Sequence, residues 1–87
     1  MIVILEHIGE IQIEEGLELL NPKMQLMSVE YDLIENTFQL EVHFWESKYR
    51  FSRQFQGVNT DVNGLTVDVV MDFVTTHPIL SQFGEIV

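Results

Sequence analysis

The clearest pattern in the chain is an alternation of apolar and polar residues that runs from Met24 to Gln56. Alternation with period two is typical of a β-strand that buries one of its faces. The alternation occurs in three successive segments, MQLMSVEYDLI, TFQLEVHFWE and KYRFSRQFQ. The pattern therefore predicts three strands of one antiparallel meander, joined by two hairpin turns.

Two-residue turns at Glu35-Asn36 and Glu46-Ser47 would fix the register of this meander. The predicted cross-strand pairs are Leu33–Phe38, Tyr31–Leu40, Val29–Val42 and Met27–Phe44 in the first hairpin, and Phe44–Tyr49, Val42–Phe51 and Phe38–Phe55 in the second. Every pair is apolar, so two independent choices of turn give one continuous apolar row across the strands.

Arg53 interrupts the apolar row, because the same register places it opposite Leu40. A guanidinium at such a position either extends past the edge of the sheet into solvent or pairs with a carboxylate. We favour the first interpretation, since the third strand is the last of the meander and is expected at an edge. The alternative is an ion pair at a functional or oligomer interface.

The strongest helical pattern is LTVDVVMDFVTT, Leu65–Thr76, which precedes Pro78. Asp68 and Asp72 recur at helical spacing and leave the apolar side chains on the opposite face. We predict a helix that packs on the apolar face of the sheet, followed by an irregular tail, ILSQFGEIV.

The N-terminal region is less regular. MIVILEHI is predicted to be a strand, and EIQIEEGLELLNP fits either a short strand with a helical turn or a hairpin about Glu15-Gly16. The chain of 87 residues has room for one hydrophobic core. We therefore expect residues 1–87 to form a single α+β domain, an antiparallel β-meander of about four strands with one C-terminal helix packed on its apolar face.

Composition excludes several classes of function. The chain has no cysteine, so disulfides, zinc–thiolate sites and thiol nucleophiles are absent. Its apolar N-terminal run lacks a basic flank and is shorter than the ~20 residues of a membrane span, so we expect a cytoplasmic protein without a membrane anchor. Fourteen Asp and Glu against four Lys and Arg give a net charge of −10, which opposes direct binding to nucleic acid.

NTDVNG, residues 59 to 64, resembles the start of a calcium-binding loop, with Asn59, Asp61 and Asn63 alternating before a glycine. A loop of the EF-hand kind needs a bidentate glutamate at its twelfth position, which here is Val70. We therefore interpret the stretch as a turn and helix cap, with Asp61 as the capping residue. Weak binding of a divalent cation by Asp61 with Asp68 is the alternative, and we predict no metal site or cofactor.

The polar face of the meander carries the remaining candidates. The predicted register places His43 between Ser28 and Arg50, and it places Glu30 across from Glu41. A histidine near carboxylates suits general-base or metal chemistry, but no second histidine is expected on this face. The chain has no Ser-His-Asp order, phosphate-binding loop or dinucleotide fingerprint, so we do not expect an enzyme.

Trp45 is predicted to lie on this polar face, beside Lys48 and Arg50. An exposed tryptophan with neighbouring cations is typical of a binding patch. The simpler alternative is that Trp45 folds over the hairpin end or is covered by the N-terminal segment. Every cation except Lys23 falls within Lys48–Arg53, which favours self-association. Either a basic strand of one copy meets an acidic face of another, or the third strands of two copies pair edge to edge. The candidate interaction residues are His43, Trp45, Lys48, Arg50 and Arg53.

These observations favour a small non-enzymatic protein–protein interaction or assembly module that forms a homo-oligomer or binds a protein partner. The alternative is a DNA-mimicking inhibitor of a nucleic-acid-binding protein, which rests on the net charge and requires rows of carboxylates at phosphate-like separation. The sequence specifies neither the identity of the partner nor the biological process.

Overall fold

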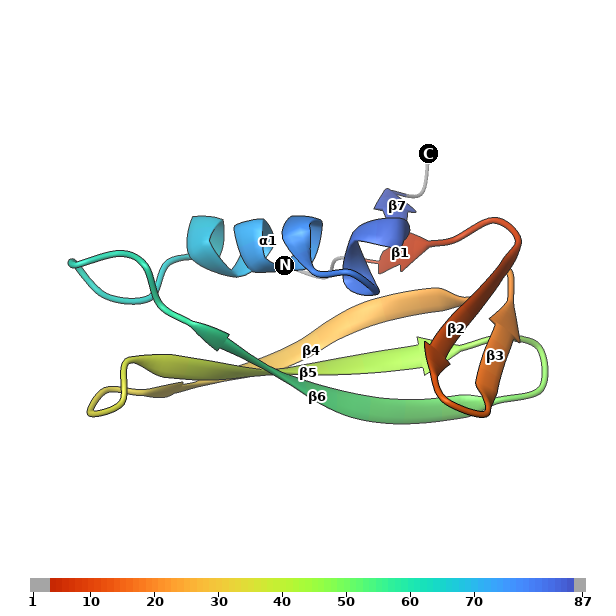
Figure 1. Ribbon diagram of the computed structural model, residues 1–87, viewed down its shortest axis with the longest axis horizontal. Coiled ribbons are helices and arrows are strands. Elements are labelled where there is room, and N and C mark those ends of the chain that lie inside the picture. Colours follow the sequence, from red (N-terminus) through yellow and green to blue (C-terminus); the bar gives the residue numbers. More distant parts are fainter. Residues whose placement is uncertain (1–3, 86–87) are drawn as a thin grey trace.

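Three long strands form the body of the protein, as seen in a computed structural model that describes residues 4–85 (Figure 1). They are β4 (Lys23–Asp32), β5 (Thr37–Trp45) and β6 (Arg50–Val58). The other elements are β1 (Ile4–Glu6), the hairpin strands β2 (Glu10–Glu14) and β3 (Leu17–Leu20), the helix α1 (Val67–Thr76), a 3-10 turn η1 (Leu80–Gln82) and β7 (Gly84–Glu85). The main sheet has the order β6-β5-β4-β1-β7, and β2 pairs with β3 in a second sheet. The predicted α+β class, a meander with one helix, is confirmed.

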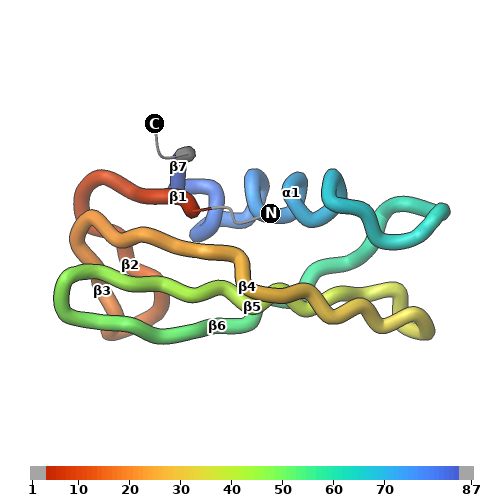
Figure 2. Tube along the Cα trace, turned by 180° about the vertical axis from the view of Figure 1, so that it is seen from behind, coloured from red at the N-terminus to blue at the C-terminus, as the bar shows by residue number. Residues whose placement is uncertain are grey.

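The core lies on one face of the meander, called the inner face below. Phe38, Leu40, Val42 and Phe44 of β5 are buried there, each at most 1% exposed. Figures 1 and 2 show that α1 covers one half of this face and that the β2–β3 hairpin lies over the other half. The covering elements add apolar side chains to the same cluster, among them Ile11, Leu19, Val70, Val74, Leu80 and Phe83. Burial of these side chains is the main force that holds the layers together.

Gly57 allows β6 to approach the helix. It pairs with Phe38, whose ring packs edge-on against Phe73 of α1 with 5.3 Å between centroids. A Cβ atom at position 57 would lie 2.5 Å from Phe38 Cζ and 2.9 Å from Phe73 Cδ1. Only glycine therefore fits between these two rings without a shift of the packing.

The two hairpin turns are longer than predicted. In the first, the Asp32 carboxylate accepts the N–H groups of Ile34 and Glu35 at 3.0 and 3.1 Å, and Asn36 takes a φ of 57°. Phe38 consequently pairs with Tyr31, and the predicted Leu33–Phe38 pair is wrong. The Asp32 side-chain oxygen stabilises this longer turn by accepting its N–H groups, so a two-residue loop does not form.

The second hairpin shifts by the same amount. Trp45 pairs with Arg50, so Phe44 faces Phe51 rather than Tyr49. Arg53 lies opposite Val42 and not Leu40. Because the shift is two residues, each side chain keeps its predicted face.

A β-bulge at Met27 changes the face of the first half of β4. Leu26 pairs with Val42 and Ser28 with Glu41, which leaves Met27 as an extra residue between them. Met24, fully buried, therefore pairs with Phe44, while Met27 is 50% exposed. The predicted Met27–Phe44 pair is wrong, and the adjacent apolar residues Leu26 and Met27 were the sequence signal of the bulge.

Both ends of the chain are more regular than expected. The hairpin about Glu15-Gly16 is the correct one of the two alternatives, and Gly16 has a φ of +81° that suits its turn. The C-terminal tail is not irregular as far as Glu85, because η1 is followed by β7, which pairs with β1. Its last two residues lie outside the described residues. The first three residues of the predicted N-terminal strand lie outside the described residues.

Candidate interaction site on the outer face

The face of the meander opposite the core, called the outer face, has no covering element among residues 4–85 (Figure 2). The outward side chains of β6, Ser52, Gln54 and Gln56, are exposed. A sheet face of this kind is stable against water only if it is polar, which explains the alternation of the three strands. The outer face is therefore accessible to another molecule.

One end of the outer face collects cations around Trp45. The register places Lys23 directly opposite Trp45 on one side and Arg50 opposite it on the other. Lys48 lies in the turn that joins β5 to β6, two residues before Arg50. Three of the four Lys and Arg residues therefore surround Trp45. The sequence prediction missed Lys23, because only the correct register brings it to this row.

An aromatic pair forms the centre of this cluster. The rings of His43 and Trp45 pack edge to face, with centroids 5.7 Å apart. Both side chains are half-buried.

 A hollow of about 290 Å³ lies beside this aromatic pair and is lined also by Gln25, Met27 and Arg50. The half-exposed Met27 of the bulge thus adds an apolar wall to an aromatic patch with a cationic rim.

The neighbours of His43 differ from the prediction. His43 pairs with Gln25 on β4 and with Ser52 on β6, and not with Ser28 and Arg50. Glu41 pairs with Ser28. Gln25 and Ser52 are polar and uncharged, so no carboxylate lies directly opposite His43 to orient it as a general base.

Carboxylates gather at the other end of the meander, around the β4–β5 turn. Glu30 pairs with Gln39 rather than lying across from Glu41 as predicted. Together with Asp32 and Glu35 it lines a broad depression of about 720 Å³. The turn residues Leu33 and Ile34 line the same depression and are 78% and 92% exposed. The meander is therefore polarised, with cations around Trp45 at one end and carboxylates at the other.

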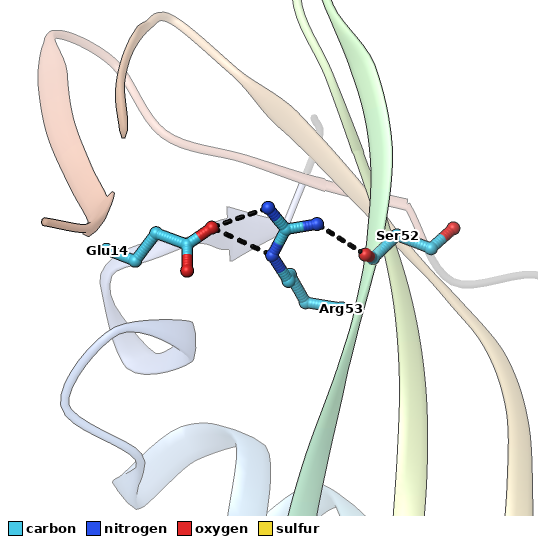
Figure 3. A network of polar contacts seen from close by, with 3 residues as sticks. All are labelled: Glu14, Ser52 and Arg53. Atoms are coloured by element: carbon cyan, nitrogen blue, oxygen red, sulfur yellow. Dashed lines mark hydrogen bonds and ion pairs between the residues drawn. The ribbon is translucent and has the colours of Figure 1, made fainter. Parts of the chain in front are cut away.

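Arg53 lies apart from the Trp45 cluster, on the inner face of the edge strand β6 (Figure 3). Its Nε donates to Glu14 Oε1 at 2.8 Å, and its Nη1 donates to the Ser52 carbonyl at 2.9 Å. The guanidinium also lies 4.9 Å from the centroid of the Phe51 ring. Arg53 lies on an edge strand, as expected, but its guanidinium pairs with a carboxylate of the β2–β3 hairpin of the same chain. The predicted ion pair at a functional or oligomer interface stays untested.

The first residue of NTDVNG is part of the core. Asn59 is 4% exposed, and its Nδ2 donates to Asn36 Oδ1 at 3.2 Å and to the Asp61 carbonyl at 3.0 Å. Its Oδ1 accepts the Asp61 N–H at 3.0 Å, and the Tyr31 hydroxyl donates to Asn36 Oδ1 at 2.6 Å. This network ties the end of β6 to the β4–β5 turn and leaves the buried amide fully hydrogen-bonded.

The turn predicted for NTDVNG is present, but the predicted cap is wrong. Asp61 accepts the N–H of Asn63 at 2.8 Å within the turn, whereas Thr66 Oγ1 accepts the N–H of Val69 at 3.3 Å and caps α1. Val70, at the position where a calcium loop needs glutamate, is a buried core residue. Within residues 4–85 no group of three His, Asp or Glu side chains is arranged to hold a metal ion.

His77 has a structural environment at the end of α1. Its Nδ1 accepts the N–H groups of Ile79 and Leu80 at 3.1 and 3.3 Å, and its ring packs edge-on against Phe55 at 5.0 Å. Burial against this apolar surface lowers the pKa of His77 from its usual value of 6.5. The neutral ring is therefore the form that suits the fold.

Comparisons with protein-family models, curated proteins and solved structures gave no match for this chain. None of the helices in the described part of the chain is long and apolar enough to cross a membrane.

Proposed function

We propose that this protein is a cytoplasmic, non-enzymatic interaction module that associates with a second copy of itself through the outer face of the meander. The observation that carries the proposal is the polarity of this face, which has Lys23, Lys48 and Arg50 around Trp45 at one end and carboxylates at the other. In an antiparallel face-to-face pair, the cationic end of each copy lies over the acidic end of its partner.

Trp45 supplies the apolar part of this contact. Tryptophan is enriched among the residues that dominate binding energy, especially where polar neighbours exclude water around it. The indole lies between Lys23 and Arg50 and beside His43, so its contact surface is framed by polar groups. The complementary charges set the orientation, and Trp45 contributes the buried area.

A charge exchange tests this proposal. Arg50→Glu and Glu30→Arg should each weaken association, and the double variant should restore it, because position 50 of one copy and position 30 of its partner then again carry opposite charges. Asp68→Arg is the matched control, since it makes the same change of charge as Glu30→Arg on the exposed side of α1. Sedimentation velocity over a range of protein and salt concentrations gives the oligomeric state.

Two results would contradict the proposal. The first is a protein that stays monomeric at high concentration and low salt. The second is a double charge variant that associates no better than either single variant. Trp45→Ala should lower the association constant by roughly tenfold or more at any salt concentration, because it removes the apolar anchor.

The alternative function, DNA mimicry, has no specific observation in its favour. It requires carboxylates in rows on one surface. Asp68 and Asp72 lie on α1, whereas Glu10 and Glu18 lie on the β2–β3 hairpin. Mimicry remains a prediction from the net charge alone.

A further inference from the structure

The edge of β4 offers a second surface, distinct from the Trp45 patch. β1 pairs with β4 only along Lys23–Gln25, and no strand within residues 4–85 pairs with that side of Ser28–Asp32. The unpaired segment is long enough, at about 3.4 Å per residue, to bind four or five residues of an added strand. Unpaired main-chain groups along a strand edge are a template for such an addition.

An apolar groove runs beside this edge, between β4 and α1. Its volume is about 370 Å³, and its floor is formed by the buried side chains of Leu40 and Val70. Val29 on β4 and Val67 on α1 line its walls and are 41% and 64% exposed. Within residues 4–85, α1 and the other elements therefore leave part of the inner face uncovered along the β4 edge.

The inward positions of β4 along this edge are all uncharged. They are Leu26, Val29 and Tyr31, which pair with buried residues of β5. The other edge strand, β6, has Arg53 at an inward position, held by Glu14. Inward charges hinder the addition of a strand, so β4 is the more suitable of the two edges for such an addition.

Two of the three outward positions next to this edge carry carboxylates. Ser28, Glu30 and Asp32 alternate with the inward apolar residues, and Glu41 lies across from Ser28. A strand added to β4 would place every second side chain in the groove and the others beside these carboxylates. We propose that β4 binds, by strand addition, an extended segment of a protein partner in which apolar and basic residues alternate.

Charge also identifies which occupant fits. A second copy that paired through its own β4 edge would bring Glu30 and Asp32 of both copies into neighbouring positions. Like charges in such positions destabilise strand pairing, so two β4 edges are poor partners for each other. A segment with lysine or arginine at its outward positions instead gains a favourable contact at each of them.

Three short peptides test the proposal. In the first, lysine and valine alternate; the second has the same composition with the lysines and valines in separate blocks; in the third, glutamate and valine alternate. The alternating lysine peptide should bind at least roughly tenfold more tightly than the block peptide at physiological salt, measured by fluorescence anisotropy. Hydrogen exchange of amides within Ser28–Asp32 should slow when it binds.

Variants locate the site. Val67→Gln should weaken binding of the alternating lysine peptide, whereas Val62→Gln, at a position that is 99% exposed, should not. Glu30→Lys should lower affinity for the lysine peptide and raise it for the glutamate peptide. Equal binding of the block peptide, an effect of Val62→Gln as large as that of Val67→Gln, or unchanged amide exchange would each overturn the proposal. Trp45→Ala should leave peptide binding unchanged, so failure of self-association would be distinguishable.

Discussion

The two outer strands of the meander, β6 and β4, belong to one sheet but differ in their inward residues and in how far the covering elements reach over them. β6 carries an inward arginine that is neutralised by Glu14, and its Gly57 locks the strand against Phe38 and Phe73. β4 carries only uncharged inward residues and borders a groove that α1 leaves open. The position of a strand in the sheet therefore does not by itself determine whether another strand can add to its edge. An inward charge on the strand and the extent to which helices or hairpins cover it determine this as well.

The largest effect is expected where β6 is locked to the helix. Gly57→Ala should lower the free energy of unfolding by about 3 kcal/mol, because the added methyl group overlaps the rings of Phe38 and Phe73. Urea denaturation measures the change. Gln56→Ala, on the exposed face of the same strand, should stay within about 0.5 kcal/mol of the parent protein. Equal midpoints for the two variants would show that β6 is not fixed in this way.

The next effect concerns the network that joins the ends of both edge strands. Asn59→Ala should lower the free energy of unfolding by about 2 kcal/mol, because it removes the hydrogen bonds that the buried Asn59 amide makes with Asn36 and with the main chain of Asp61. Asn63→Ala is the control, since Asn63 is exposed. Amides near Tyr31 should also exchange faster in the Asn59 variant. Unchanged exchange there would mean that the network does not hold the end of β4.

A smaller effect on stability, but a larger one on association, is expected at Arg53. Arg53→Val should change the free energy of unfolding by at most about 1 kcal/mol, because the ion pair with Glu14 is half exposed. It should nevertheless raise self-association through β6, since an inward charge is replaced by an apolar residue. Light scattering against concentration measures this. Glu14→Gln keeps the inward charge and should not raise association; if it does, the ion pair rather than the charge protects the edge.

The smallest effect is a pH dependence at His77, which packs on Phe55 of β6. Its pKa is lowered in the folded protein by burial, so below pH 6.5 the unfolded chain binds more protons than the folded one. Stability should fall as the pH decreases below 6.5 and should level off, for this group, below the folded pKa. Unfolding free energies measured across this range should show a weaker slope for His77→Gln. An identical slope would exclude His77 as the source.

The strands and their faces were predictable because alternation survives errors in the turns. An error of two residues in the β5–β6 turn left Phe51 and Phe55 on the inner face. The bulge at Met27 was not foreseen, because alternation alone does not show which of two adjacent apolar residues is the extra one. The bulge places Met24 in the core, where the sequence pattern had predicted Met27.

The candidate site was predictable only in part, because it depends on register. Trp45 and Arg50 were expected together, but Lys23 joins them only when β4 is aligned through the bulge. Arg53 was grouped with them from sequence proximity and lies on the other face. The groove beside Val67 depends on where α1 stops covering the sheet, which no local pattern indicates.

The order of the covering elements along the chain bears on how the protein folds during synthesis. The β2–β3 hairpin leaves the ribosome before the meander, whereas α1 follows it. Phe38 and its neighbours on β5 therefore have no helix to pack against until Val67–Thr76 has been made. In that interval the nascent sheet exposes the apolar surface that α1 later covers.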